Sequence, residues 1–139
     1  SGDIIVYSKS FEETRIRELM RFFPQYEKEL AEICSRMKDL ANVFRKPVVY
    51  HQDFEGSYSI KKVMPVLCPE LSYKTLQIQN GSDSQFYYFK VFKGLVSYRG
   101  KNKILKDLIL YNQLDVYAMY KILQKLFLLQ KPTETKSVA

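Results

Sequence analysis

The stretch 103–130, KILKDLILYNQLDVYAMYKILQKLFLLQ, contains neither glycine nor proline and predicts a long helix. Steps of three and four residues place six side chains on one helical face: Leu108, Tyr111, Asp115, Met119, Ile122 and Leu126. Five of these suit a packed core. Asp115 does not, because burying its carboxylate without a partner would cost roughly several kcal/mol. We therefore expect a cation, a metal ion or a hydrogen-bond donor beside Asp115.

The composition indicates one folded, basic domain. The chain has 139 residues, of which 46% are hydrophobic, enough to bury a core. Its formal net charge of +7 favours an anionic partner, with nucleic acid or an acidic membrane surface as the usual candidates. The cations are spread along the chain without a run of five like charges, which is also typical of ordinary solvated faces.

The two cysteines, Cys34 and Cys68, stand in apolar settings without CxxC spacing. They predict buried free thiols in a reducing cytoplasm. The sequence has no apolar stretch of about eighteen residues and no signal-peptide pattern, so neither a membrane span nor export is indicated. We expect a cytoplasmic protein without a membrane partner.

The first element is a run of β-prone residues at 4–7, IIVY, which predicts a strand buried on both faces of a parallel sheet. A single strand cannot satisfy its own backbone. Its partners lie outside this sequence, two copies pair edge to edge, or the segment adapts. A strand so close to the first residue also suggests that the chain was cut from a longer protein.

The remaining pattern is helical. Helices are expected from Ser8 or Ser10 to about residue 23, over about 25–44, from Ser57 or Ser59 to 67, and from Ser82 or Asp83 to about 94. A basic loop is expected over 95–103, before the long helix. The predicted fold class is mainly α, one strand plus five or six helices, in a single domain over 1–131 with a disordered tail at 132–139.

Two short patterns carry chemistry. Tyr111 lies one helical turn before Asp115, so a carboxylate that ligates Mg²⁺ would stand beside a phenol that orients water. A helix-internal Tyr–Asp hydrogen bond explains the same spacing. Glu12 follows the apolar strand at the start of a helix, where open α/β sheets place their sites, and it also suits the helix dipole.

Together these patterns resemble the second and third motifs of the DEDD 3′–5′ exonucleases, which have a ribonuclease-H-like fold. Over nearly the whole chain the sequence resembles a bacterial domain of unknown function, number 2779, that follows restriction-enzyme-like nuclease modules in longer proteins. The residues that carry this likeness are FEETRIREL, FRKPVVYHQDFEGSYSIKKVMPVLCPELSYK, IQNG and LILYNQLDVYAMYKIL. The resemblance implies that the chain is the C-terminal portion of an α/β ribonuclease-H-like fold.

The resemblance assigns roles by position. Glu12 and Asp115 match two acidic metal ligands, and Tyr111 matches the tyrosine that assists the attacking water in the tyrosine subtype. Mg²⁺ or Mn²⁺ is implied for the full-length protein. His51 does not match the histidine subtype and is expected to be a loop or structural residue.

Two departures limit the activity expected of this chain. Ser8 and Glu12 stand where the family commonly has Asn and Asp, and the first motif, Asp-x-Glu on a strand, does not precede them. Asp53-Phe54-Glu55 has the right letters but is expected to be a loop with solvated acids. With two of four acidic ligands, the isolated fragment is expected to bind no metal and to be inactive.

Nucleic-acid contacts are expected from five cations, Lys61, Lys62, Arg99, Lys101 and Lys103. The expected function is therefore the C-terminal part of a two-metal 3′–5′ exonuclease for DNA or RNA, with an upstream nuclease module in the same protein. A non-catalytic helical module that binds nucleic acid is the alternative. A third alternative is a protein-interaction unit that forms a homodimer through the exposed strand.

Overall fold

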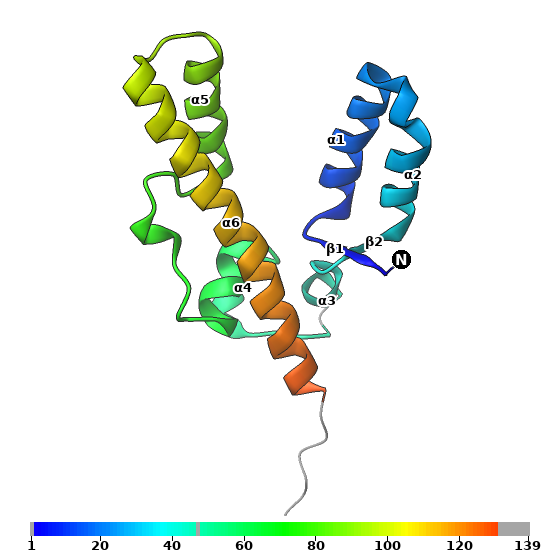
Figure 1. Cartoon of the computed structure of the whole chain (residues 1–139). Coiled ribbons are helices and arrows are strands. Elements are labelled where there is room, and N and C mark those ends of the chain that lie inside the picture. Colours follow the sequence, from blue (N-terminus) through cyan, green and yellow to red (C-terminus); the bar gives the residue numbers. More distant parts are fainter. Residues whose placement is uncertain (1, 47, 131–139) are drawn as a thin grey trace, which may run out of the picture.

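The computed structural model describes residues 2–46 and 48–130. Over these residues the chain is mainly helical, with six α-helices and one two-stranded sheet (Figure 1). The elements run β1 (Ile4–Val6), α1 (Lys9–Phe22), α2 (Glu27–Arg36), β2 (Met37–Asp39), α3 (Asn42–Arg45), α4 (Ile60–Leu67), α5 (Gly81–Phe92) and α6 (Tyr98–Leu129). The tail predicted at 132–139 lies outside the described residues. The mainly α class is confirmed.

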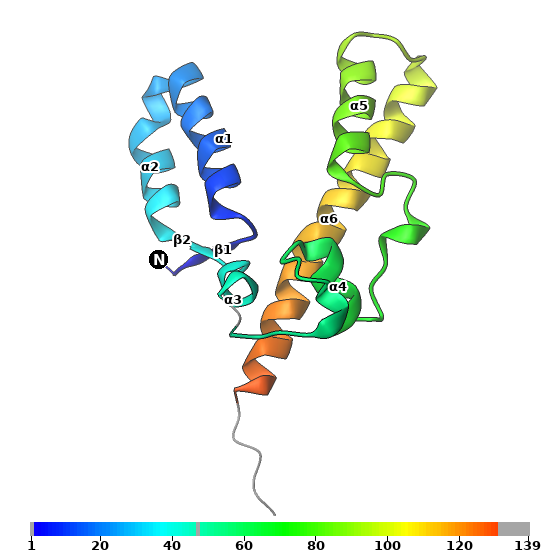
Figure 2. The ribbon, with the colours of Figure 1, turned by 180° about the vertical axis from the view of Figure 1, so that it is seen from behind.

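The long helix α6 is the spine of the fold. α5 packs along its N-terminal half, while α4 packs against its C-terminal half, as both views show (Figures 1 and 2). The helices α1 and α2 form a pair that extends from the two short strands (Figure 1). The strands lie at the level of the middle of α6 (Figure 1). The apolar face predicted on α6 is confirmed, because Ile122 and Leu126 are buried and the other four predicted residues are half-buried.

The core lies between the C-terminal half of α6, α4 and the segment around α3. Its buried members are Leu40, Phe44, Phe54, Val63, Met64, Cys68, Tyr73, Ala118, Ile122 and Leu126. Neither α1 nor α5 has a buried residue, and Cys34 is the buried residue of α2. Both cysteines are buried free thiols, as expected. The packing is therefore concentrated at one end of α6.

The strand at the N-terminus finds its partner within this chain. β1 pairs in parallel with β2, in the register Ile4 to Met37, Ile5 to Lys38 and Val6 to Asp39. The prediction of one strand and of a continuous helix over 25–44 is therefore wrong. The chain leaves α2 at Met37, which is extended, and its pairing with β1 satisfies the backbone groups of that strand.

Two further predictions need correction. The basic loop expected over 95–103 is helical from Tyr98, because the Ser97 hydroxyl accepts a hydrogen bond from the Gly100 N–H at 3.2 Å and caps α6. α5 is capped by Asn80, whose side chain accepts from the Asp83 N–H at 2.9 Å, rather than by Ser82 or Asp83. Ser59 caps α4, one of the two positions expected.

Of the described helices, none is both long and apolar enough to cross a bilayer. The glycine at position 56 adopts a positive φ of 71° in the turn before α4, a conformation that glycine adopts without strain.

We expect Ile122→Ala to lower the free energy of unfolding by about 2–5 kcal/mol, because the fully buried side chain would leave a cavity in the core. Urea denaturation measures the loss. Ile109→Ala on the same helix is the matched control, since Ile109 is 58% exposed and its truncation leaves no cavity. Equal losses in both variants would contradict the described position of the core.

Candidate functional site

Asp115 has a hydrogen-bond donor, as its place on the apolar face of α6 requires. The Tyr73 hydroxyl donates to Asp115 Oδ1 at 2.5 Å. Tyr73 lies in a short 3-10 turn between α4 and α5, and its ring is buried while Asp115 is half-buried. The sequence predicts a partner for Asp115 but does not identify Tyr73, because 42 residues separate the two.

Lys61 and Tyr111 complete a cluster around this hydrogen bond. The rings of Tyr73 and Tyr111 lie 5.8 Å apart between centroids. The Lys61 ammonium lies 3.8 Å from the Tyr73 centroid and 4.8 Å from the Tyr111 centroid, and it donates to the Gln79 carbonyl at 2.6 Å. We call Lys61, Tyr73, Tyr111 and Asp115 the Asp115 cluster. It joins α4, α6 and the segment between α4 and α5.

Burial sets the protonation of the cluster. Burial and the hydrogen bond to Asp115 raise the pKa of Tyr73 well above its ordinary value. Burial first, and the Asp115 charge second, raise the pKa of Tyr111 to about 12. Burial lowers the pKa of Lys61, against the opposing attraction of Asp115 and Asp83. Both phenols are therefore protonated donors at neutral pH.

A second acid, Asp39, lies at the carboxyl end of the sheet. Asp39 Oδ1 accepts from the Ser8 N–H at 2.9 Å and the Ala41 N–H at 3.0 Å, and Arg45 Nη1 lies 3.7 Å from Asp39 Oδ2. The side chain is only 7% exposed, so these partners compensate its burial. Sequence reasoning missed Asp39 because it lay inside a predicted helix. The unpartnered strand at 4–7 was the signal that a second strand should exist.

Glu12 is half-buried in the first turn of α1, directly after β1. This turn begins at the carboxyl end of the parallel pair, the edge where open α/β sheets hold their sites. β1 also lies near α6, because Ile5 lines one pocket together with Val116 and Met119. The structure thus brings the strand before Glu12 to the part of α6 that follows Asp115.

The predicted metal ligands do not form a complete site among the described residues. Within residues 2–46 and 48–130, no group of three or more His, Cys, Asp or Glu side chains is arranged to hold a metal ion. Asp115 and Glu12 offer oxygen donors, which suit Mg²⁺ or Mn²⁺, but one Asp115 oxygen already accepts from Tyr73. These residues alone do not fit a two-metal centre, so further ligands would have to come from elsewhere.

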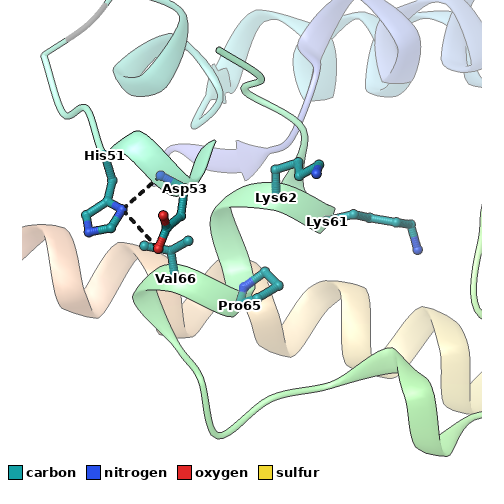
Figure 3. Close-up of a pocket in the computed structure, with 6 residues that line it drawn as sticks. All are labelled: His51, Asp53, Lys61, Lys62, Pro65 and Val66. Carbon is teal, nitrogen blue, oxygen red and sulfur yellow. Dashed lines mark hydrogen bonds and ion pairs between the residues drawn. The ribbon is translucent and has the colours of Figure 1, made fainter. Parts of the chain in front are cut away.

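Lys62 and the segment before α4 line a shallow pocket of about 630 Å³ (Figure 3). Lys62 forms an ion pair with Glu55 at 2.5 Å. His51 Nδ1 accepts from the Asp53 N–H at 3.2 Å, a structural role of the kind expected for this histidine. Asp53 and Glu55 are exposed on either side of buried Phe54, so the loop with solvated acids is confirmed. The pocket therefore carries both signs of charge.

Three of the other predicted cations lie apart from this pocket. The first turns of α6 carry three exposed cations, Arg99, Lys101 and Lys103. This is the end of α6 against which α5 packs (Figure 1). Lys61 lines the pocket beside Lys62 (Figure 3), and its ammonium also lies against the tyrosine rings of the Asp115 cluster. The five cations predicted to contact nucleic acid thus fall in two places, at the start of α4 and in the first turns of α6. Whether any of them contacts nucleic acid stays a prediction.

Comparison with known proteins supports one part of the resemblance. Residues 1–59 match the family described as a domain of unknown function (DUF2779). The chain is 33% identical to an uncharacterized protein of Ureaplasma parvum serovar 3 and 28% identical to one of Mycoplasma pneumoniae. Each match covers 85% of this chain but 19% of the relative, so the chain spans about a fifth of the length of these relatives. No solved structure matches the chain.

We expect Tyr73→Phe to lower the free energy of unfolding by about 1–3 kcal/mol, because the half-buried Asp115 carboxylate would lose its donor. Thermal or urea denaturation at neutral pH measures the change. Tyr120→Phe is the matched control on α6, since the exposed Tyr120 hydroxyl only accepts from Gln124. If Tyr73→Phe were as stable as the control, the hydrogen bond would not support the fold.

The stability of the protein should fall between pH 10 and 12 partly through Tyr111. Its pKa rises from 10.0 to about 12 on folding, so the folded state holds this proton more tightly than the unfolded chain. The resulting stability is complete below pH 10 and is lost as the pH approaches 12. Urea denaturation should therefore show a shallower alkaline decline for Tyr111→Phe. Tyr98→Phe, whose ring is 82% exposed, should decline as the wild type does.

Proposed function

We propose that this chain is the C-terminal part of a two-metal 3′–5′ exonuclease acting on DNA or RNA, and that the isolated fragment is inactive. The observation that carries the proposal is the setting of Tyr111 and Asp115 on one half-buried face of α6. The same helix lies near β1, because Ile5 of β1 and Val116 of α6 line one pocket. The helix that follows β1 carries Glu12 in its first turn. The strand that precedes Glu12 therefore lies near the part of α6 that follows Asp115.

In this proposal Glu12 and Asp115 hold Mg²⁺ or Mn²⁺, and Tyr111 orients the attacking water. The metal ions would supply activation of water and stabilisation of the leaving oxygen. Tyr111 fits its role because its phenol is neutral and can donate or accept at neutral pH. Tyr73 is a positioning residue: its hydrogen bond to Oδ1 fixes the orientation of the Asp115 carboxylate.

The remaining ligands would come from another part of a longer polypeptide. The relatives are long enough to contain such a part, because the chain matches only 19% of their length. An upstream restriction-enzyme-like nuclease module belongs to the same proposal, because the resemblance implies it. The incomplete set of acids in the described residues is the reason to expect no cleavage by this fragment.

The alternative is a non-catalytic helical module that binds nucleic acid. It is favoured by the segment 84–106, which holds six cations and no acid. This alternative requires that salt-dependent binding survives Asp115→Ala and fails when Lys101, Lys103 and Lys106 are neutralised. A protein-interaction unit, with β1 pairing two copies, would instead form a dimer detectable by sedimentation at several concentrations.

In the natural full-length protein, Asp115→Asn should reduce Mg²⁺- or Mn²⁺-dependent cleavage of a 3′-labelled single strand by at least about a hundredfold, as expected for loss of a metal-site carboxylate. Asp107→Asn is the matched control, because Asp107 is a half-buried acid two turns earlier on α6. Circular dichroism verifies that both variants are folded. Cleavage by Asp115→Asn at the wild-type rate would refute the proposal.

A further inference from the structure

The end of the hairpin formed by α5 and α6 carries an exposed surface of aromatic rings and cations. Its members are Phe86, Phe89, Lys90, Phe92, Lys93 and Tyr98, which we call the hairpin surface. Phe92 is 71% exposed and Tyr98 is 82% exposed, and α5 has no buried residue. Large aromatic side chains gathered on an exposed helix usually mark a contact site. In both views this hairpin projects away from α1 and α2 (Figures 1 and 2).

The rings and the cations of α5 are paired. Lys90 Nζ lies 4.3 Å from the Phe86 centroid, and Lys93 Nζ lies 5.7 Å from the Phe89 centroid and 6.0 Å from that of Phe92. Spacings of three and four residues place Phe86, Phe89, Lys90 and Lys93 on one side of the helix. A ligand on this surface would therefore meet flat apolar rings and positive charges within a few ångströms of one another.

The charge of the surrounding segment is one-sided. Residues 84–106 contain Lys90, Lys93, Arg99, Lys101, Lys103 and Lys106, and no aspartate or glutamate. These like charges repel one another on a hairpin whose two helices lie side by side. A polyanion would relieve this repulsion and release its own counterions. Charge complementarity therefore indicates a phosphate-bearing partner.

From these observations we infer that the hairpin surface binds single-stranded nucleic acid. The exposed rings would stack on unpaired bases while Lys90, Lys93 and the cations of α6 contact phosphates. A duplex offers phosphates but keeps its bases stacked inside, so it would use the cations and leave the rings unused. An anionic membrane is less well matched, because inserting these rings into lipid would draw the adjacent ammonium groups toward hydrocarbon.

The hairpin surface and the Asp115 cluster both include residues of α6. Tyr98 of the hairpin surface and Asp115 of the cluster both lie on α6, and their separation of 17 residues corresponds to about 26 Å of helix. A pocket of about 200 Å³ lined by Tyr87, Lys103 and Asp107 lies between them. A strand bound at the hairpin surface could thus follow α6 toward the cluster. This directional part of the inference rests on the proposed exonuclease function, whereas the binding part does not.

The test measures binding by the natural full-length protein in EDTA, with a fluorescent oligothymidylate of about twenty nucleotides, longer than one such site. Phe89→Ala and Phe92→Ala should each weaken binding about five- to hundredfold. The double variant Lys90→Gln/Lys93→Gln should make the slope of log affinity against log salt shallower, by about 0.7 for each phosphate that these lysines neutralise. Matched controls are Phe22→Ala, at a ring 77% exposed on α1, and Lys28→Gln/Lys46→Gln, at exposed lysines elsewhere.

Each outcome has a fixed meaning. Loss of binding in the hairpin variants with retention in the controls supports the inference. Binding that is unchanged by Phe89→Ala and Phe92→Ala overturns it, as does equal affinity for a blunt duplex of the same length. Vesicles of phosphatidylserine and phosphatidylcholine are tested in parallel, and binding to vesicles without binding to the oligonucleotide also overturns it. Asp115→Asn should keep full binding, so failure of the exonuclease proposal remains distinguishable from failure of this inference.

Discussion

A carboxylate on the packed face of a 32-residue helix needs a hydrogen-bond donor, and this need constrains much of the fold. The donor is Tyr73, which reaches Asp115 only because the chain leaves α4 and runs along α6 before α5 begins. The same path brings the Gln79 carbonyl to Lys61, whose ammonium covers both tyrosine rings. One polar contact thus fixes the connection between α4 and α5 and orders the four side chains of the cluster.

The sequence predicted the elements that local chemistry determines. Helices α1, α4, α5 and α6 follow from apolar periodicity, and the cap at Ser59 follows from the residue preceding α4. Met37–Asp39 could not be recognised in this way, since three residues have no readable period and their apolar spacing also suits a helix. Its extended form depends on β1, more than thirty residues earlier, and on Asp39 accepting the Ser8 N–H. The contact between Tyr73 and Asp115 could not be predicted either, because it joins residues that are distant in the sequence.

The uneven distribution of burial also has a physical meaning. The core gathers at the C-terminal half of α6, while α1 and α5 bury no side chain completely. These outer helices are held by partial packing, as α1 is against α2 and α5 is against α6. Such elements contribute less hydrophobic stabilisation and open more readily than the core. Their exposed rings are accordingly the surfaces most available to a ligand or to another part of a longer polypeptide.

The arrangement of charge along α6 links the two surfaces. Its first turns are basic, with Arg99, Lys101, Lys103 and Lys106 before the first acid, Asp107, and Asp115 follows two turns later. A polyanion is attracted to the basic end and repelled near Asp115 unless a cation offsets that carboxylate. Lys61 supplies part of this offset, but burial lowers the pKa of its ammonium group and thus weakens its hold on the proton. A divalent cation bound at Asp115 would remove the remaining repulsion, so strand binding at the basic end of α6 and cation binding near its middle should favour each other.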